Sequence, residues 1–245
     1  MKIETVSLII SAVGSVGAFI AGVVALFTLK ELKKQRESSY KPALMLLRKS
    51  HKVVMKSLGP VKLGYHWGEA SSPNVIPQET IPLINLGYGA AKNITLDWKF
   101  EHEKLLEDAN KLAHTTHQEY FLKVDKQTLS AVSKDMILLN IIANNEQQQV
   151  DFLLPNTTNK GVLSVEIPSL YTVLTSCYLS LCVHAKLKPE DIKLPMLSLV
   201  IEFQDVASKK YNKEFRFECD IKHFYKGSQK SGEELPMCEL KLTQI

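Results

Sequence analysis

The chain has 245 residues, with 30 Lys and Arg against 26 Asp and Glu, and therefore a formal net charge of +4. The charge is uneven: residues 30–62 hold ten Lys and Arg and two acids, whereas residues 63–245 carry a net charge of −4. No stretch interleaves basic and aromatic side chains along one strand or helix, which argues against a nucleic-acid-binding protein.

Residues 6–29 contain no charge, no Asn, no Gln and no Pro. A bilayer core of about 30 Å needs about 20 apolar helical residues, so this stretch predicts one membrane-spanning helix within an anchor of residues 1–29. A cleaved signal peptide would need a basic start, a shorter apolar centre and a small-residue cleavage site. A buried helix of a soluble protein is the other alternative, and an all-round apolar helix of this length disfavours it.

Basic residues follow the apolar stretch in a segment, residues 30–41, that we expect to form a juxtamembrane helix and linker. They are Lys30, Lys33, Lys34 and Arg36, followed by Lys41. Basic residues stay on the cytoplasmic side and attract anionic lipid headgroups. The chain is therefore expected in the inner membrane, with its N-terminus outside and its C-terminal domain in the cytoplasm. The helix should end before Pro42, because the residue before a proline avoids helical geometry.

Small residues recur every four positions within the predicted anchor. One line is formed by Gly14, Ala18 and Gly22, and another by Gly17, Ala21 and Ala25. Such lines allow the backbones of two membrane helices to approach closely, and they predict a homo-oligomer formed through this helix. The alternative is that Gly and Ala are simply frequent in membrane helices.

Short apolar or alternating stretches in residues 42–225 predict strands. They cover residues 43–47, 53–55, 62–67, 80–86, 93–100, 136–142, 149–154, 162–167, 197–203 and 211–221. Helices are predicted over residues 101–117 and 169–181. Many short strands with two helical insertions indicate a mainly β (α+β) domain, an antiparallel β-sandwich.

Several details of this domain are specific enough to be checked. Pro82 should lie on an edge strand or at a first strand position. Residues 136–142 should form a buried strand paired with residues 149–154. Residues 226–245 are expected to be a partly flexible tail, to which Cys238, Leu240 and Leu242 could add an edge strand.

A glycine-containing loop, with Asn85, Gly87, Gly89 and Asn93, resembles a phosphate loop because it follows a strand. However, a strand rather than a helix follows it, and a third glycine is missing. A tight connection between strands is the alternative, in which the glycines supply positive φ and the asparagines bond the loop backbone. The loop is thus a structural connection first and a possible ligand site second.

No residue pattern predicts catalysis, a metal or another cofactor. His114 and His117 lie three apart on a predicted helix, but no HExxH pattern surrounds them. Cys177 and Cys182 would point about 140° apart on a helix, which disfavours a shared metal with His184. The four cysteines have no disulfide or zinc spacing, which fits a reducing compartment. We therefore expect a protein that is not an enzyme.

Two loose patterns, I-N-x-G-x-G-x-A-x-N-I at residues 84–94 and I-E-F-Q-D-V-x-x-K-K-Y at residues 201–211, follow the anchor and its basic linker. Together they resemble bacterial single-pass membrane proteins of unknown function with an immunoglobulin-like cytoplasmic domain. The resemblance implies an immunoglobulin-like β-sandwich and transfers no catalytic residue.

Two functions follow as hypotheses. The first is a membrane-tethered, non-enzymatic interaction module that binds an unknown protein partner or a small ligand beside the membrane. The alternative is a membrane-perturbing effector, of the defence or toxin type, whose helices oligomerise into a pore. An enzyme whose site is spread over several loops is a third possibility, and it would need a deep pocket lined by titratable side chains.

Overall fold

The computed structural model describes residues 3–54, 66–67, 78–126, 128–134, 136–142, 147–156, 162–228 and 234–245. The helices are α1 (Ile3–Ser39), α2 (His102–Thr115), α3 (Ser169–His184) and the short 3-10 helix η2 (Pro189–Asp191). The strands are β1 (Leu44–Leu46), β2 (Ser50–Val54), β3 (His66–Trp67), β4 (Thr80–Asn85), β5 (Ala91–Phe100), β6 (Phe121–Asp125), β7 (Thr128–Ser133), β8 (Met136–Ile142), β9 (Gln147–Leu153), β10 (Val162–Glu166), β11 (Leu197–Gln204), β12 (Lys210–Ser228) and β13 (Glu234–Gln244).

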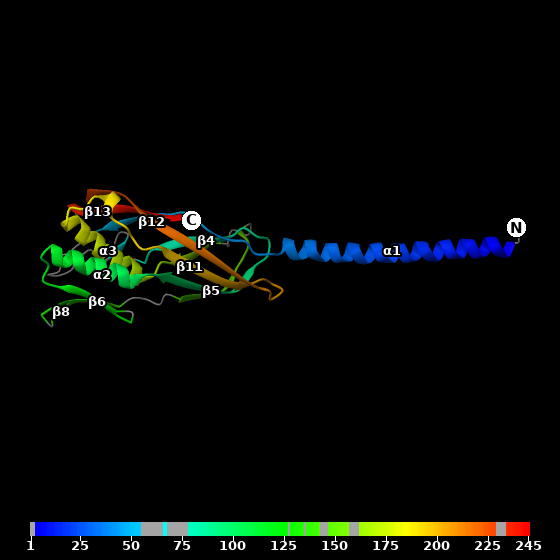
Figure 1. Cartoon of the computed structure of the whole chain (residues 1–245), viewed down its shortest axis with the longest axis horizontal. Coiled ribbons are helices and arrows are strands. Elements are labelled where there is room, and N and C mark those ends of the chain that lie inside the picture. Colours follow the sequence, from blue (N-terminus) through cyan, green and yellow to red (C-terminus); the bar gives the residue numbers. More distant parts are fainter. Residues whose placement is uncertain are drawn as a thin grey trace.

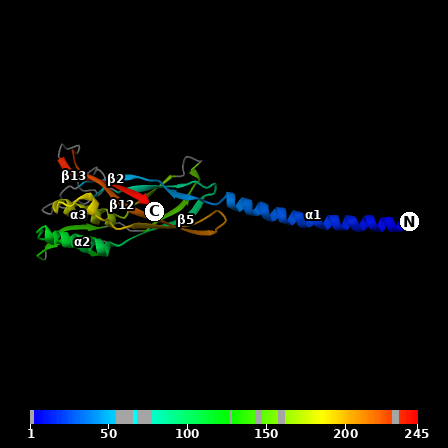
Figure 2. The same cartoon turned by 45° about the horizontal axis from the view of Figure 1, so that its top comes forward.

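The chain is mostly β, with 47% strand and 31% helix, as the sequence predicts. Figure 1 shows α1 projecting away from a β-rich domain, with α2 and α3 toward the opposite end; Figure 2 shows the same arrangement from a second direction. The helix ends at Ser39, before Pro42, which confirms the expected end of α1. Its 37 residues correspond to a length of about 55 Å at 1.5 Å per residue.

All strand pairs of the described residues are antiparallel, and they form three sheets. The largest has seven strands in the order β3-β2-β13-β12-β11-β5-β9, and the others have the orders β1-β4-β10 and β6-β7-β8. The predicted alternation of β5 is confirmed, since Ile94, Leu96 and Trp98 are all at most 2% exposed. The β11–β12 hairpin is also confirmed, with Leu197 opposite Phe217 and Gln204 opposite Lys210.

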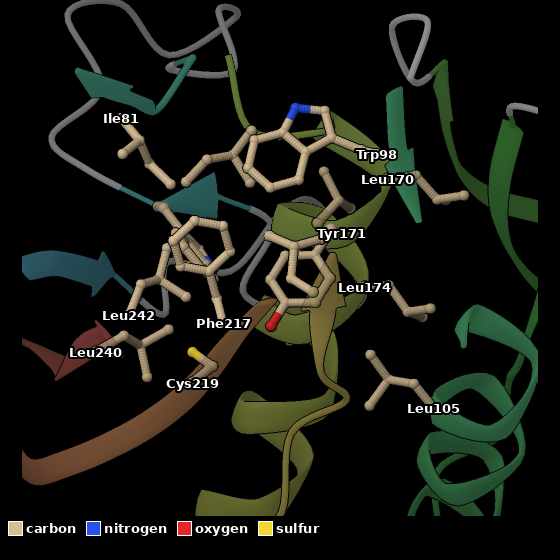
Figure 3. Packing of buried hydrophobic residues seen from close by; sticks show 14 of the residues in the cluster. Ile81, Trp98, Leu105, Leu170, Tyr171, Leu174, Phe217, Cys219, Leu240 and Leu242 are labelled. Atoms are coloured by element: carbon tan, nitrogen blue, oxygen red, sulfur yellow. The ribbon is translucent and has the colours of Figure 1, made fainter. Parts of the chain in front are cut away.

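Helix α3 lies inside the core. All of its residues from Leu170 to Cys182 are buried, which suits a helix that carries no charged side chain over this stretch. Figure 3 shows Tyr171 and Leu174 of α3 among core residues that come from β5, α2, β12 and β13. A helix was predicted here, but its position between the seven-stranded sheet and α2 depends on partners far away in the sequence.

The placement predicted for Pro82 is wrong, because β4 is the central strand of its sheet and Pro82 is its third residue. Strand β1 pairs only with residues Leu83 to Asn85 of β4, while Pro82 pairs with Ser164 of β10 on the other side. The Pro82 carbonyl accepts a bond from the Leu47 N–H (2.8 Å), which continues the β1–β4 register by one residue. The reciprocal bond would need an N–H on Pro82, so proline removes one bond on this side, where β1 ends.

The predicted pairing of residues 136–142 with residues 149–154 is also wrong. Strand β8 pairs with β7, and β9 pairs with β5 in the seven-stranded sheet. Nor is β8 buried along its length, because Met136, Ile137 and Ile142 are more than 60% exposed. No strand was predicted at β6 or β7, which precede β8 in the sequence, and the correct neighbour of β8 was therefore missing from the prediction.

The C-terminal segment forms β13, which lies between β12 and β2 inside the seven-stranded sheet and is not an edge strand. Cys238, Leu240 and Leu242 are at most 3% exposed. Their burial joins this segment to the same core as the rest of the domain. Two parts of the predicted strands, residues 62–65 and Met55, lie outside the described residues.

Candidate functional site at the helix–domain junction

The link between α1 and β1, residues 40–43, lies against the loop that joins β4 to β5. The Ala43 carbonyl accepts a bond from the Leu86 N–H (2.8 Å), and the Ala43 N–H donates to Asn85 Oδ1 (3.0 Å). Together they join the N-terminal segment to the end of β4 and the first residue after it, and the bond to Asn85 spans 42 residues of sequence. The anchor helix is therefore attached to the domain by more than the covalent chain.

The side chain of Asn85 holds this junction together, because every hydrogen-bonding position of its carboxamide group is used. Its Oδ1 accepts from the N–H groups of Ala43 and Gly87, both at 3.0 Å. Its Nδ2 donates to the carbonyls of Gly89 (2.7 Å) and Leu153 (3.2 Å), so it joins the link, the loop and the end of β9. The residue is 0% exposed, and it uses both donors and both acceptor positions of a carboxamide.

The two glycines of the loop allow the link to approach closely. A Cβ on Gly87 would lie 2.3 Å from the Lys41 carbonyl oxygen, and a Cβ on Gly89 would lie 1.6 Å from the Tyr40 carbonyl oxygen. Neither glycine has a φ in the left-handed region, so the expected reason for them is wrong. The space beside them is filled by the chain's own residues 40–43. The glycines therefore serve the close approach of the link, which fits the structural interpretation of this loop.

Asn93 does not brace this loop, contrary to expectation. It is exposed, and its Nδ2 makes one long bond to Gln204 Oε1 (3.4 Å). Its φ is +50°, and the β5–β11 register shifts between Glu202 and Gln204. Asn93 therefore serves a β-bulge, where asparagine tolerates the left-handed conformation.

The β11–β12 hairpin forms the other side of the junction, and its turn lies at the end of the domain nearest α1 (Figure 1). The Tyr211 ring stacks on Phe203 with centroids 5.3 Å apart, and its hydroxyl donates to Asp205 Oδ2 (3.0 Å). Burial alone would raise the pKa of Asp205, but bonds from the Lys209 N–H and the Tyr211 hydroxyl outweigh it and hold that pKa below the usual range.

Lys213 ties the hairpin to the start of β1. Its Nζ donates to the Leu44 carbonyl at 2.7 Å and lies 4.7 Å from the centroid of the Phe215 ring. Partial burial lowers the pKa of Lys213. This contact crosses 169 residues of sequence, which is why no local pattern could have predicted it.

A hollow of about 540 Å³ lies between the link, the loop and the hairpin. This junction hollow is lined by Lys41, Pro42, Ala43, Leu44, Leu86, Gly87, Tyr88, Phe203, Tyr211, Asn212 and Lys213. Tyr88 and Leu86 are 74% and 55% exposed. Gly87 is the one residue of this lining that the sequence indicated as a possible ligand residue, because the others are ordinary lysines, aromatics and apolar residues in three separate segments.

The predicted helix-packing and headgroup residues all lie on the exposed surface of α1. A Cβ placed on Gly14, Gly17 or Gly22 would meet nothing within 4 Å. Lys30, Lys33, Lys34 and Arg36 lie in the last part of α1, between the apolar stretch and the junction. The structure thus places the two sets in separate zones along one continuous helix.

The buried His51 and the partly exposed Glu79 form a polar pair that no sequence pattern indicated. His51 Nδ1 lies 2.8 Å from Glu79 Oε2, which also accepts from Lys49 Nζ (3.1 Å). The His51 bond, ahead of Lys49, lowers the pKa of Glu79. His51 Nε2 has no partner among the described atoms, and its ring packs 5.3 Å from Trp67. The pair joins β2 to the residue that precedes β4, at the margin of the core.

The candidate metal ligands are not gathered at one place. His114 and His117 are exposed, Cys177 and Cys182 are buried in α3, and His184 is exposed at its end. In the part of the chain that the structure describes, no three His, Cys, Asp or Glu side chains lie close enough to hold a metal ion. All four cysteines are free and buried, and burial raises the pKa of the Cys177, Cys182 and Cys219 thiols to about 12.

Comparison of the chain with protein-family models, curated proteins and solved structures gives no significant match. The class of protein that the structure itself defines is an antiparallel β-rich domain carried on one N-terminal helix. That helix is long and apolar enough, over Gly14–Arg36, to cross a membrane.

Proposed function

We propose that this chain is a membrane-tethered, non-enzymatic interaction module. The observation that carries the proposal is the exposure of α1: none of its residues from Gly14 to Arg36 is buried, although their mean hydropathy is 1.7. Eight large apolar side chains in this part of α1 are between 49% and 74% exposed. Moving them out of water is worth on the order of 10–20 kcal/mol, which strongly favours lipid.

The proposed orientation places the domain on the cytoplasmic side. What supports it is the cluster of Lys30, Lys33, Lys34 and Arg36 between the apolar stretch and the domain. Each basic residue near an anionic leaflet contributes about 1 kcal/mol of attraction. Four free and buried thiols are in keeping with a reducing compartment.

The proposed role of the junction is to hold the domain in a defined position relative to the membrane. Asn85, the two glycines and Lys213 support this role, because they fix the link to both sides of the domain within five residues of the end of α1. The junction hollow supports binding rather than catalysis, because its lining carries no carboxylate, histidine or cysteine. An immunoglobulin-like relationship is part of the proposal, and the antiparallel β11–β12 hairpin supports it.

Self-association through α1 is the second part of this proposal. The lines of Gly14, Ala18 and Gly22 and of Gly17, Ala21 and Ala25 are uncovered by the chain's own domain, which leaves them for a second copy. A pore would need the same association, so a depolarisation assay separates a pore from a plain anchor. Gly14→Leu and Gly22→Leu variants test whether any depolarisation depends on helix packing.

Fractionation of cells that express the full chain tests the proposal. We expect the protein in the membrane pellet after alkaline carbonate extraction, and a C-terminal tag that protease reaches only after the cells are opened. A matched control replaces Phe19 and Leu26 with Lys, since both side chains are about 70% exposed and their loss leaves the domain untouched. A wild-type chain found in the soluble fraction, or a tag cleaved on intact cells, would refute it.

A further inference from the structure

The junction hollow carries positive charge on two sides. Lys41 comes from the link and Lys213 from β12, and no carboxylate lies in the lining. The bond from Lys213 to the Leu44 carbonyl uses one of the three donors of its ammonium group. Lys41 Nζ lies 5.3 Å from the centroid of the Tyr211 ring, so its charge is held at the rim of the hollow.

Flat and apolar groups form the rest of the wall. Tyr211 and Phe203 present a stacked pair on the hairpin side, and the exposed Tyr88 and Leu86 face them from the glycine loop. The carboxylate of Asp205, in the hairpin turn, accepts bonds from the Tyr211 hydroxyl and the Lys209 N–H. The hollow therefore combines two lysine ammonium groups, neither of which has a carboxylate partner among the described residues, with ring-sized apolar surface, and its volume falls in the range of small-molecule sites.

We propose that the junction hollow binds a small organic phosphate, whose phosphate lies between Lys41 and Lys213 and whose ring packs against the exposed Tyr88 and Leu86. Lysine ammonium groups bind phosphate as point charges, and aromatic rings contribute by stacking. Such a ligand touches the link and the hairpin together, and it thereby strengthens the attachment of α1 to the domain.

The position of the hollow along α1 decides between a soluble phosphate and a lipid headgroup. Ten residues of helix separate the end of the apolar stretch at Leu29 from Ser39, a distance of about 15 Å. The headgroup layer on each side of a bilayer is only about 5–8 Å thick. The hollow then lies in water beyond the headgroups, so the ligand is soluble. Only this choice of source depends on the proposed membrane location.

Calorimetric titration of the full chain in zwitterionic nanodiscs tests the inference, with AMP as the probe and adenosine and inorganic phosphate as its two halves. We expect AMP to bind at least tenfold more tightly than either half. Lys41→Met, which removes the charge and keeps the stem, should weaken AMP binding about tenfold, the loss expected for one charge-assisted contact. Tyr88→Ala should weaken it severalfold without touching the bonds of Asn85.

Lys123→Met on β6, an exposed lysine away from the hollow, is the matched control and should leave the affinity unchanged. The inference is overturned if AMP gives no heat at millimolar concentration, if adenosine binds as tightly as AMP, or if Lys123→Met weakens binding as much as Lys41→Met. A second titration in nanodiscs with anionic phospholipid separates the sources: loss of AMP binding there would assign the hollow to a headgroup and refute a soluble ligand. Fractionation tests the membrane location independently.

Discussion

The junction predicts a large and local effect for Asn85→Ala. The substitution removes four hydrogen bonds in a site that is 0% exposed, and it leaves the N–H groups of Ala43 and Gly87 and the carbonyls of Gly89 and Leu153 without their partner. At about 1 kcal/mol for each bond, the loss in the free energy of unfolding is about 4 kcal/mol. Domains are commonly stable by only about 5–15 kcal/mol, so this loss is severe.

Denaturant unfolding of the full chain in detergent measures this loss, with the fluorescence of the buried Trp67 and Trp98 as the signal. Amide hydrogen exchange gives the local readout, since the Ala43 and Gly87 N–H groups should exchange faster in the variant. Asn93→Gly is the control, because it removes one long bond and keeps a positive φ at low cost, and it should change stability by less than about 0.5 kcal/mol. A loss below about 1 kcal/mol for Asn85→Ala, or an equal loss for Asn93→Gly, would refute the role assigned to Asn85.

Three further predictions concern the junction and the core. Gly89→Ala should destabilise the domain by several kcal/mol, because its Cβ would lie 1.6 Å from the Tyr40 carbonyl oxygen. Glu79→Gln should cost about 1–2 kcal/mol at neutral pH. Because the folded pKa of Glu79 lies below 4.5, its contribution is present above that pH and is lost as the pH falls, so the variant should lose less stability than the wild type on acidification. The buried thiols should react slowly with iodoacetamide until the domain unfolds. Because burial raises their pKa in the folded state above that of the unfolded chain, the free energy of unfolding should fall as the pH rises above about 9.

Each of these predictions has its own control. Gly14→Ala should leave the domain unchanged, since a Cβ there meets nothing within 4 Å. For Glu79, an acid unfolding curve of the variant that runs parallel to that of the wild type would count against the prediction. For the thiols, rapid labelling of the folded chain would show that the core opens without unfolding, because Cys177, Cys182 and Cys238 are 0% exposed.

Local patterns predicted where the strands and helices of the domain lie better than they predicted which strands pair with each other. The alternation of β5 and the apolar stripe of α2 depend on nearby residues only, and both elements form where expected. The pairing of β8 was mispredicted, because its choice between β7 and β9 depends on which apolar faces meet in the core. Pro82 was misjudged for a similar reason, since the rule for proline depends on where the neighbouring strand ends.

The candidate site could be predicted only in part. The sequence pointed to the loop around Asn85 and favoured a structural role, and the structure supports that choice. It could not show that Asn85 bonds Ala43 and Leu153, which lie 42 and 68 residues away. Nor could it show that the glycines make room for the link, because a close approach leaves no mark in the composition of either segment.

The amino-acid sequence by itself determined that this chain has one long apolar helix with a basic C-terminal end, because lipid solubility depends on the side chains of that stretch alone. It also determined that the remainder is rich in strands, because alternation and turn residues act locally. Tertiary structure alone decided the order of the sheets, the burial of α3 and the junction that joins α1 to the domain. Those features are contacts between segments far apart in the chain, such as Lys213 and Leu44, and they exist only after the core has brought the segments together.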